Sequence, residues 1–163
     1  MQEMWKLFHE DDMIKYDEPL LSEDSAHLQM VLSHAAYSGV EAPRTMKLLG
    51  TIQGRAVVIL VDFGSSHTFV SSSVARDLTG KMSLDRALKV QVANGDSMQC
   101  DAHVCHALWA VQGYEFHSDL KVFPLQYFGM VLGYDWLEQF SPMQVHGGLK
   151  WMAVPYQGKT VVI

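Results

Sequence analysis

LVDFGSSHTFVS, residues 60–71, is the stretch that decides the fold, because it places a carboxylate where an apolar segment ends. Asp62 follows the apolar residues 56–61, and Phe63, Gly64 and a row of hydroxyl side chains come after it. A strand that ends in a tight glycine turn holds such a carboxylate rigidly and partly away from water. The stretch therefore predicts a functional acid at position 62, against the plainer alternative of a turn aspartate that caps its own backbone.

The triplet Asp62-Phe63-Gly64 also spells the magnesium-binding motif of protein kinases. A kinase needs a glycine-rich phosphate loop, a strand lysine and a His-Arg-Asp catalytic loop before this triplet. The sequence contains none of them, and 163 residues are too few for two lobes. The kinase interpretation is therefore rejected.

Composition and charge restrict the function further. Apolar residues make up 48% of the chain and charged residues 18%, which allows one domain with a real core. Residues 1–45 carry three basic and nine acidic side chains, whereas residues 46–163 carry nine of each, so the whole net charge of −6 lies in the first part. This predicts an acidic, partly ordered leader or linker at 1–44 and a domain at 45–163. It also argues against direct nucleic-acid binding, which needs a basic surface.

Targeting and membrane signals are not evident in the sequence. The longest apolar run, residues 56–61, is far shorter than the roughly 18 residues of a membrane span. The N-terminus lacks the basic start and apolar core of a signal peptide. Cys100 and Cys105 are the only cysteines and are expected to be free thiols. We therefore expect a cytoplasmic protein without membrane contact.

From residue 45 the pattern is one of short strands separated by turns. Residues 46–62 indicate a hairpin around Gln53-Gly54, and residues 88–100 a hairpin around Asn94-Gly95, a pair suited to the positive φ angles of a type I′ turn. Further elements are a turn near Gln112-Gly113, an apolar strand at 128–133, short helices at 71–78 and 135–140, and three short C-terminal strands. Many short strands with frequent turns predict an all-β barrel or sandwich.

The motifs together carry a family resemblance. LVDFGSSHTFVS is followed, in order, by VQVANGDSMQC (90–100), FHSDLKVFPL (116–125), YFGMVLGYDWL (127–137) and FSPMQVH (140–146). Residues 46–163 thereby resemble the retropepsin-like aspartic protease domain of plant Ty3/gypsy-type retrotransposon polyproteins, and LSHAAYSG resembles the segment that precedes it. The resemblance implies a small closed barrel of six to eight strands with one or two short helices.

The resemblance also assigns roles to individual residues. Asp62 would be the catalytic aspartate, in an active-site loop with Phe63, Gly64, Ser65 and Ser66. Val131, Leu132 and Gly133 would bracket that loop. The flap that closes over substrate would comprise Val92, Ala93, Asn94, Gly95, Asp96, Ser97 and Met98. No cofactor and no metal are implied.

A second chain is implied as well, because the sequence contains only one Asp-x-Gly. The second carboxylate must then come from another copy, in a homodimer with the site on its two-fold axis. Two adjacent carboxylates share a proton, so that one activates water while the other binds the scissile carbonyl. The implied substrate is a polypeptide, the chain's own polyprotein, cleaved in the cytoplasm in the context of a virus-like particle.

Phe63 departs from the family pattern, which has Ser or Thr at this position. That hydroxyl hydrogen-bonds across the dimer, and a phenylalanine ring cannot replace it. Overpacking of this kind typically costs about 1–3 kcal/mol. The family also often has Asp where this chain has Gly129. An alternative is therefore a retropepsin-fold module with impaired catalysis that acts in dimerisation or peptide binding. A third option is a ubiquitin-pathway protease relative with the same barrel, which no residue selects.

Other chemistry-bearing residues receive plainer interpretations. Cys100, His103, Cys105 and His106 suggest a zinc cluster, but on a strand Cys100 and His106 would point to one face and the other two to the opposite face. Four ligands could not converge, so no metal site is expected. The hydroxyls after Asp62 lack a Gly-x-Ser-x-Gly elbow and are expected to build turns and caps.

Overall fold

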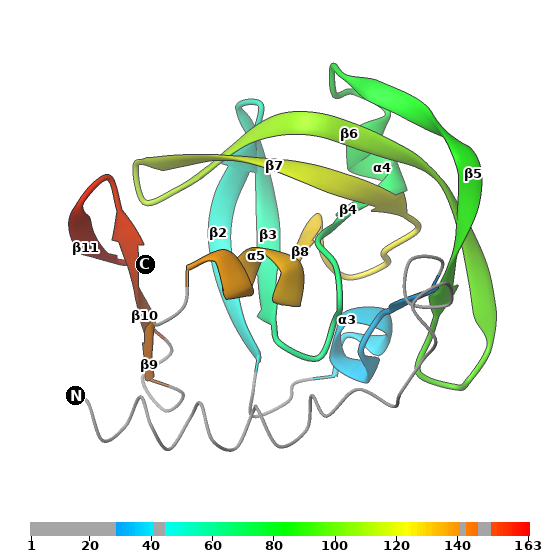
Figure 1. The fold of residues 1–163 in the computed structure, drawn as a ribbon, viewed down its shortest axis with the longest axis horizontal. Helices are drawn as coiled ribbons and strands as arrows, with labels where there is room; N and C mark the ends of the chain where they lie inside the picture. Colours follow the sequence, from blue (N-terminus) through cyan, green and yellow to red (C-terminus); the bar gives the residue numbers. More distant parts are fainter. Residues whose placement is uncertain (1–28, 41–44, 141–142, 147–150) are drawn as a thin grey trace.

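The hairpin that leads to Asp62 is the centre of the fold. In the computed structural model, which describes residues 29–40, 45–140, 143–146 and 151–163, β2 (Thr45–Ile52) runs antiparallel to β3 (Arg55–Asp62) (Figure 1). The turn between them has positive φ at both Gln53 and Gly54, as a type I′ turn requires. Asp62 is the last residue of β3, so the strand delivers the acid to one end of the sheet.

Six strands close into a ring around a common core. Each strand pairs with the next, and the sixth pairs back with the first, in the order β6 (Ser97–Val111), β2, β3, β8 (Met130–Leu132), β4 (Phe69–Ser71) and β7 (Tyr114–Phe123). Two of these contacts are parallel, β3 with β8 and β4 with β7. The expected small closed barrel is therefore confirmed.

Two strands extend the sheet beyond the ring. β5 (Lys81–Gln91) pairs antiparallel with β6, and β1 (Gln29–Val31) pairs parallel with β5. A short helix, α3 (His34–Ser38), follows β1, and Figure 1 shows this blue segment beside the end of the barrel at which β3 terminates. Residues upstream of the hairpin thus pack on the barrel.

Short helices follow two of the barrel strands. α4 (Ser72–Ala75) begins after β4, and the Ser71 hydroxyl caps it by accepting from the Ser73 amide, as the serine run predicted. α5 (Tyr134–Gln139) begins directly after the Gly133 that ends the apolar segment of β8. Within the described residues, no helix is long and apolar enough to cross a membrane.

The C-terminal residues form a separate three-stranded antiparallel sheet. It consists of β9 (Gln144–His146), β10 (Trp151–Tyr156) and β11 (Lys159–Val162), with β10 in the middle. The β10–β11 turn again has positive φ at a Gln-Gly pair, Gln157-Gly158. The three predicted C-terminal strands are thus present.

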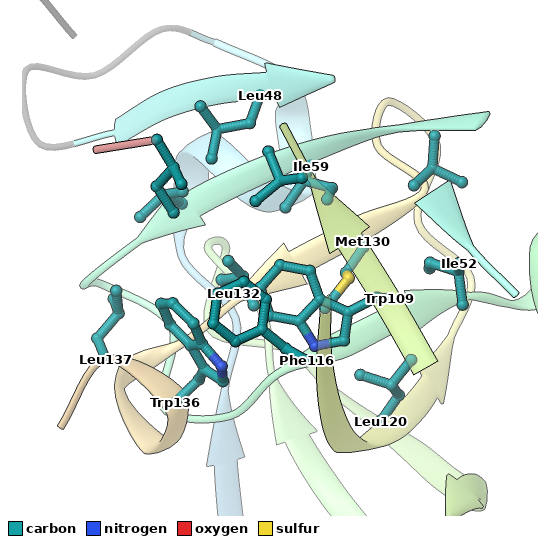
Figure 2. Packing of buried hydrophobic residues seen from close by; sticks show 14 of the residues in the cluster. Leu48, Ile52, Ile59, Trp109, Phe116, Leu120, Met130, Leu132, Trp136 and Leu137 are labelled. Atoms are coloured by element: carbon teal, nitrogen blue, oxygen red, sulfur yellow. The ribbon is translucent and has the colours of Figure 1, made fainter. Parts of the chain in front are cut away.

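The buried side chains form two clusters. The first core cluster fills the barrel, and Figure 2 shows Trp109, Phe116 and Trp136 close together within it. Trp109 stacks on Phe116 with ring centroids 4.6 Å apart, and Trp136 meets both rings edge-on at 5.3 and 5.5 Å. The second core cluster lies between β5, β6, β8 and the segment around β1; it includes Met30, Leu32, Leu60, Val90, Phe123 and Val131. β3 and β8 contribute to both clusters, because their alternate side chains point to opposite faces.

Two local expectations were wrong. At Asn94-Gly95 only Gly95 has positive φ, whereas a type I′ turn needs positive φ at both residues. The Val92 amide donates to the Asp96 carbonyl and the Gly95 amide to the Val92 carbonyl, so residues 93–95 form a three-residue loop. In β6, His106 has φ of 50° and the register with β7 shifts between Val104 and Ala107. This bulge turns His106 to solvent while Cys100 is buried, so these two residues do not share a face.

Candidate active site

The Asp62 carboxylate is buried at the end of β3, with 2% of the residue exposed. Three donors satisfy it. The Gly64 amide donates to Oδ1 at 2.8 Å, the Ser65 hydroxyl donates to Oδ2 at 2.9 Å, and the Ser33 hydroxyl donates to Oδ2 as well. A buried carboxylate needs such donors to offset its lost hydration. The acid is therefore held in one orientation by its own loop and by residue 33.

The bracketing segment lies directly against this loop. Val131 and Leu132 of β8 pair with Leu60 and Val61 of β3, in parallel, so β8 runs beside the strand that carries the acid. At Gly133 a side chain would have no room, because an added Cβ would stand 2.0 Å from the His67 carbonyl oxygen. The apolar-apolar-glycine pattern thus has a physical cause, which is the close approach of two backbones.

Hydrogen bonds fasten the two segments to each other. The Tyr134 amide donates to the Ser65 carbonyl at 2.8 Å, and the Asp135 amide donates to the Ser66 carbonyl at 3.2 Å. The Thr68 hydroxyl accepts from the Gly133 amide and donates to Asp135 Oδ1 at 2.7 Å. The hydroxyl row after Asp62 therefore builds the loop, as expected.

His67 lies next to the acid loop. Its Nδ1 is 2.7 Å from the Ser66 hydroxyl oxygen. Burial lowers the pKa of His67 from its ordinary value of 6.5, Asp135 opposes that change, and Lys121 adds to it. The ring is therefore favoured in its neutral form in the folded chain.

Phe63 and Gly129 sit in well-packed surroundings. The Phe63 ring is partly buried and packs against the first core cluster. At Gly129 an added Cβ would meet Val57 Cβ at 2.7 Å, so the aspartate that the family often carries there would clash with the side chain of Val57. Val57 of the neighbouring strand β3 therefore occupies the space that a side chain at position 129 would need.

The predicted flap is a hairpin whose base is buried and whose tip is exposed. Val92 is 3% exposed and belongs to the second core cluster, and Met98 packs partly against that cluster. The intervening residues are exposed, and the Asp96 amide donates to Asn94 Oδ1 at 2.9 Å. The base of this hairpin is connected to the acid loop through residues 31–33.

Residues 31–33 join the predicted flap to the acid loop through hydrogen bonds of their own backbone groups. The Leu32 amide donates to the Gln91 carbonyl, next to the flap, and the Ser66 amide donates to the Val31 carbonyl, both at 2.9 Å. The Ser33 amide donates to the Ser65 hydroxyl at 3.1 Å. Ser33 was not among the site residues predicted from the sequence. Its only signal was its place in LSHAAYSG, the segment that resembles the one before the family's domain, and this says nothing about a contact 29 positions away.

The cysteine and histidine residues of β6 do not form a metal site in the described part of the chain, where no group of three His, Cys, Asp or Glu side chains could hold an ion. Cys105 Sγ lies 3.4 Å from His103 Nε2, on the face that alternation predicted for this pair. Cys100 is a free buried thiol, and burial raises its pKa above the ordinary value of 9.0.

Comparison with known proteins gives one family match. A sequence model of the family described as retroviral aspartyl protease matches residues 33–147. No curated protein matches the chain.

Solved structures similar to this chain have low sequence identity to it. The retroviral protease-like domain of Ddi1 from Leishmania major is 14% identical, with a TM-score of 0.50, and the alignment covers 72% of this chain and 91% of that one. EIAV protease in complex with the inhibitor HBY-793 is 12% identical, over 61% of this chain and 91% of that one, with a TM-score of 0.45. Simian foamy virus (mac) protease is 20% identical, over 58% and 97%, with a TM-score of 0.39.

Proposed function

Because the chain belongs to the retroviral aspartyl protease family, we propose that it is an aspartic endopeptidase whose catalytic acid is Asp62. The observation that carries the proposal is the built acid loop. A buried carboxylate at the end of β3 is held by the Gly64 amide and the Ser65 hydroxyl, and Gly133 is pressed against the same loop. The substrate would be a polypeptide. More specifically, the chain would cleave its own polyprotein in the cytoplasm.

The proposed reaction uses two copies of Asp62. The sequence holds one Asp-x-Gly, so the second carboxylate would come from a second chain in a two-fold dimer. One carboxylate would take a proton from water, which attacks the scissile carbonyl carbon. The protonated partner would donate a hydrogen bond to the carbonyl oxygen and later a proton to the leaving amine. The flap, residues 92–98, would cover the bound peptide.

A second candidate function rests on Phe63. Where the family has a hydroxyl that bonds across the dimer, this chain has a ring packed against the first core cluster. Without that bond the two acids would be held less firmly, and a displacement of about 1 Å can reduce a rate about a hundredfold. The alternative is a module that keeps the fold for dimerisation or peptide binding.

Peptide cleavage at about pH 4 to 6, where a carboxylate pair shares one proton, tests both candidates. Asp62→Asn keeps the shape of the side chain and should lower kcat by at least about 10²–10⁴-fold. Phe63→Ser restores the hydroxyl, and Phe63→Leu is its apolar control. Cleavage by the unmodified chain that Asp62→Asn abolishes supports the endopeptidase. Cleavage only with Phe63→Ser supports the impaired module, and cleavage that survives Asp62→Asn contradicts both.

A further inference from the structure

Residues 29–33 lie between the flap-bearing strand and the acid loop as an added strand. On one side β1 pairs in parallel with residues 89–91 of β5, and the Leu32 amide continues this pairing to the Gln91 carbonyl. On the other side the Ser66 amide donates to the Val31 carbonyl, and the Val31 amide donates to the Ser66 hydroxyl at 2.8 Å. Both edges of this short segment are thus hydrogen-bonded, as in strand addition of an extended peptide.

The side chains of this segment alternate between buried and exposed. Met30 and Leu32 are each 1% exposed and belong to the second core cluster, whereas Val31 is 40% exposed. The apolar residues around Met30 and Leu32 come from β5, β3 and β8, among them Val90, Leu60 and Val131. Burial of two apolar side chains stabilises the docked segment, so it is held by side chains as well as by backbone bonds.

Ser33 then brings the segment onto the acid. Its hydroxyl donates to Asp62 Oδ2 and accepts from the Ala36 amide, so the chain turns away into α3 directly after reaching the carboxylate. An added Cβ at Gly64 would meet Ser33 Cβ at 3.1 Å, which shows how closely the segment crosses the loop. Oδ2 already accepts from Ser33 and Ser65, so water or a scissile carbonyl cannot approach it on the side that Ser33 holds.

We propose that residues 29–33 are a tethered ligand of the chain's own peptide-binding site. The site takes an extended peptide with large apolar side chains two positions apart, and a peptide from outside binds only after this segment leaves. The proposal rests on the proposed function, because it concerns the same site around Asp62. It adds a chemical class of ligand and a condition for access to the acid.

The tether sets the expected size of the effect. A segment on the same chain acts at an effective concentration of about millimolar. It therefore competes strongly with a free peptide, and weakening its own side chains should release that competition. We expect a free peptide to bind a chain with a weakened segment at least about tenfold more tightly than the unmodified chain.

Fluorescence anisotropy with a labelled synthetic peptide, HLQMVLSHAA (the sequence of residues 27–36), tests this on the full chain. The opened variant is Met30→Ser/Leu32→Ser, and Val31→Ser, on the exposed side of the same strand, is the matched control. A tenfold gain in affinity in the opened variant alone supports the proposal. Equal affinity in all three proteins, or no binding to an opened variant whose circular dichroism is native, overturns it.

Hydrogen exchange on the unmodified chain keeps the test decisive if the opened variant fails to fold. Millimolar free peptide should speed exchange of the Leu32 amide, because the peptide displaces the bond to Gln91. Binding without any change at Leu32 would place the peptide elsewhere and overturn the proposal.

Cleavage assays separate this proposal from the protease proposal. An opened variant that binds the peptide while no variant cleaves leaves the tethered ligand standing and removes the endopeptidase. Equal kcat/KM for a peptide substrate in the opened variant and the unmodified chain removes the tethered ligand and leaves the endopeptidase standing.

Discussion

His67 couples the acid loop to pH through the cost of charging a partly buried ring. Its pKa in the folded chain lies below the ordinary 6.5 because burial outweighs the attraction of Asp135. As the pH falls below about 6.5, the unfolded chain therefore takes up the proton first. The unfolded state then binds more protons than the folded state, so stability falls with falling pH in this window and is unaffected by His67 above it.

We predict that His67→Asn reduces this acid sensitivity. Urea unfolding of the unmodified chain at pH 7.5 and at pH 5.5 should show a larger loss of unfolding free energy than the variant shows over the same range. His117→Asn, at an exposed position, is the control and should keep the slope. A variant slope equal to that of the unmodified chain would mean that His67 does not carry the effect.

At the same scale, the sequence predicted most of the acid loop but not all of it. Asp62, Gly64 and Gly133 could be recognised because a tight turn and a close backbone approach leave few residue types that fit. Ser33 could not, because its bond to Asp62 spans 29 positions and depends on how the segment before the barrel folds back. The bulge at His106 was missed for a similar reason, since one residue with positive φ in β6 reverses every later face assignment.

Among elements, the pairing of β8 with β3 depends on a small residue. Gly129 precedes β8, its amide donates to the Val58 carbonyl at 3.0 Å, and its missing side chain makes room for Val57. This contact keeps β8 in register beside the strand that ends in Asp62.

We predict that Gly129→Ala destabilises the chain by about 1–3 kcal/mol, because its Cβ would overlap with Val57. Val57→Gly removes both overlapping atoms, Cβ at 2.7 Å and Cγ1 at 2.8 Å, so the double variant should cost less than the two single variants together. Chemical denaturation of the four proteins measures this difference. If the losses of unfolding free energy in the two single variants add up to the loss in the double variant, the two positions do not overlap sterically.

Strands and turns were predicted unevenly. The alternating hairpins were recognisable because one face of each strand is buried. The Asn94-Gly95 loop differs from the predicted two-residue turn because the hydrogen bond from the Val92 amide to the Asp96 carbonyl leaves three residues, 93–95, in the loop. Both residues have positive φ, as in a type I′ turn, at three Gln-Gly pairs: Gln53-Gly54, Gln112-Gly113 and Gln157-Gly158.

For the whole molecule, the proposed dimer makes activity depend on pairs of chains. If each site needs two Asp62 carboxylates, a dimer of one Asp62→Asn chain and one normal chain should be inactive. Mixing equal amounts of the two, after exchange, leaves about a quarter of the dimers with two intact acids.

We predict that such a mixture has about half the activity expected for unmixed populations. The measurement is peptide cleavage in whichever background is active, the unmodified chain or Phe63→Ser. An equal amount of an unrelated protein in place of the Asp62→Asn chain controls for dilution. Activity that follows the amount of intact chain in direct proportion would mean that one chain carries a complete site.

The parallel contact between β3 and β8 also determines when, during synthesis on the ribosome, the acid loop can be completed. Leu60 pairs with Val131, which follows it by 71 positions, and the loop is not bracketed until that partner exists. At about 5–20 residues per second, a ribosome needs about 4 to 14 seconds to add those positions. During that interval a growing chain already carries the acid and its three hydrogen-bond donors, but not the strand that brackets the loop.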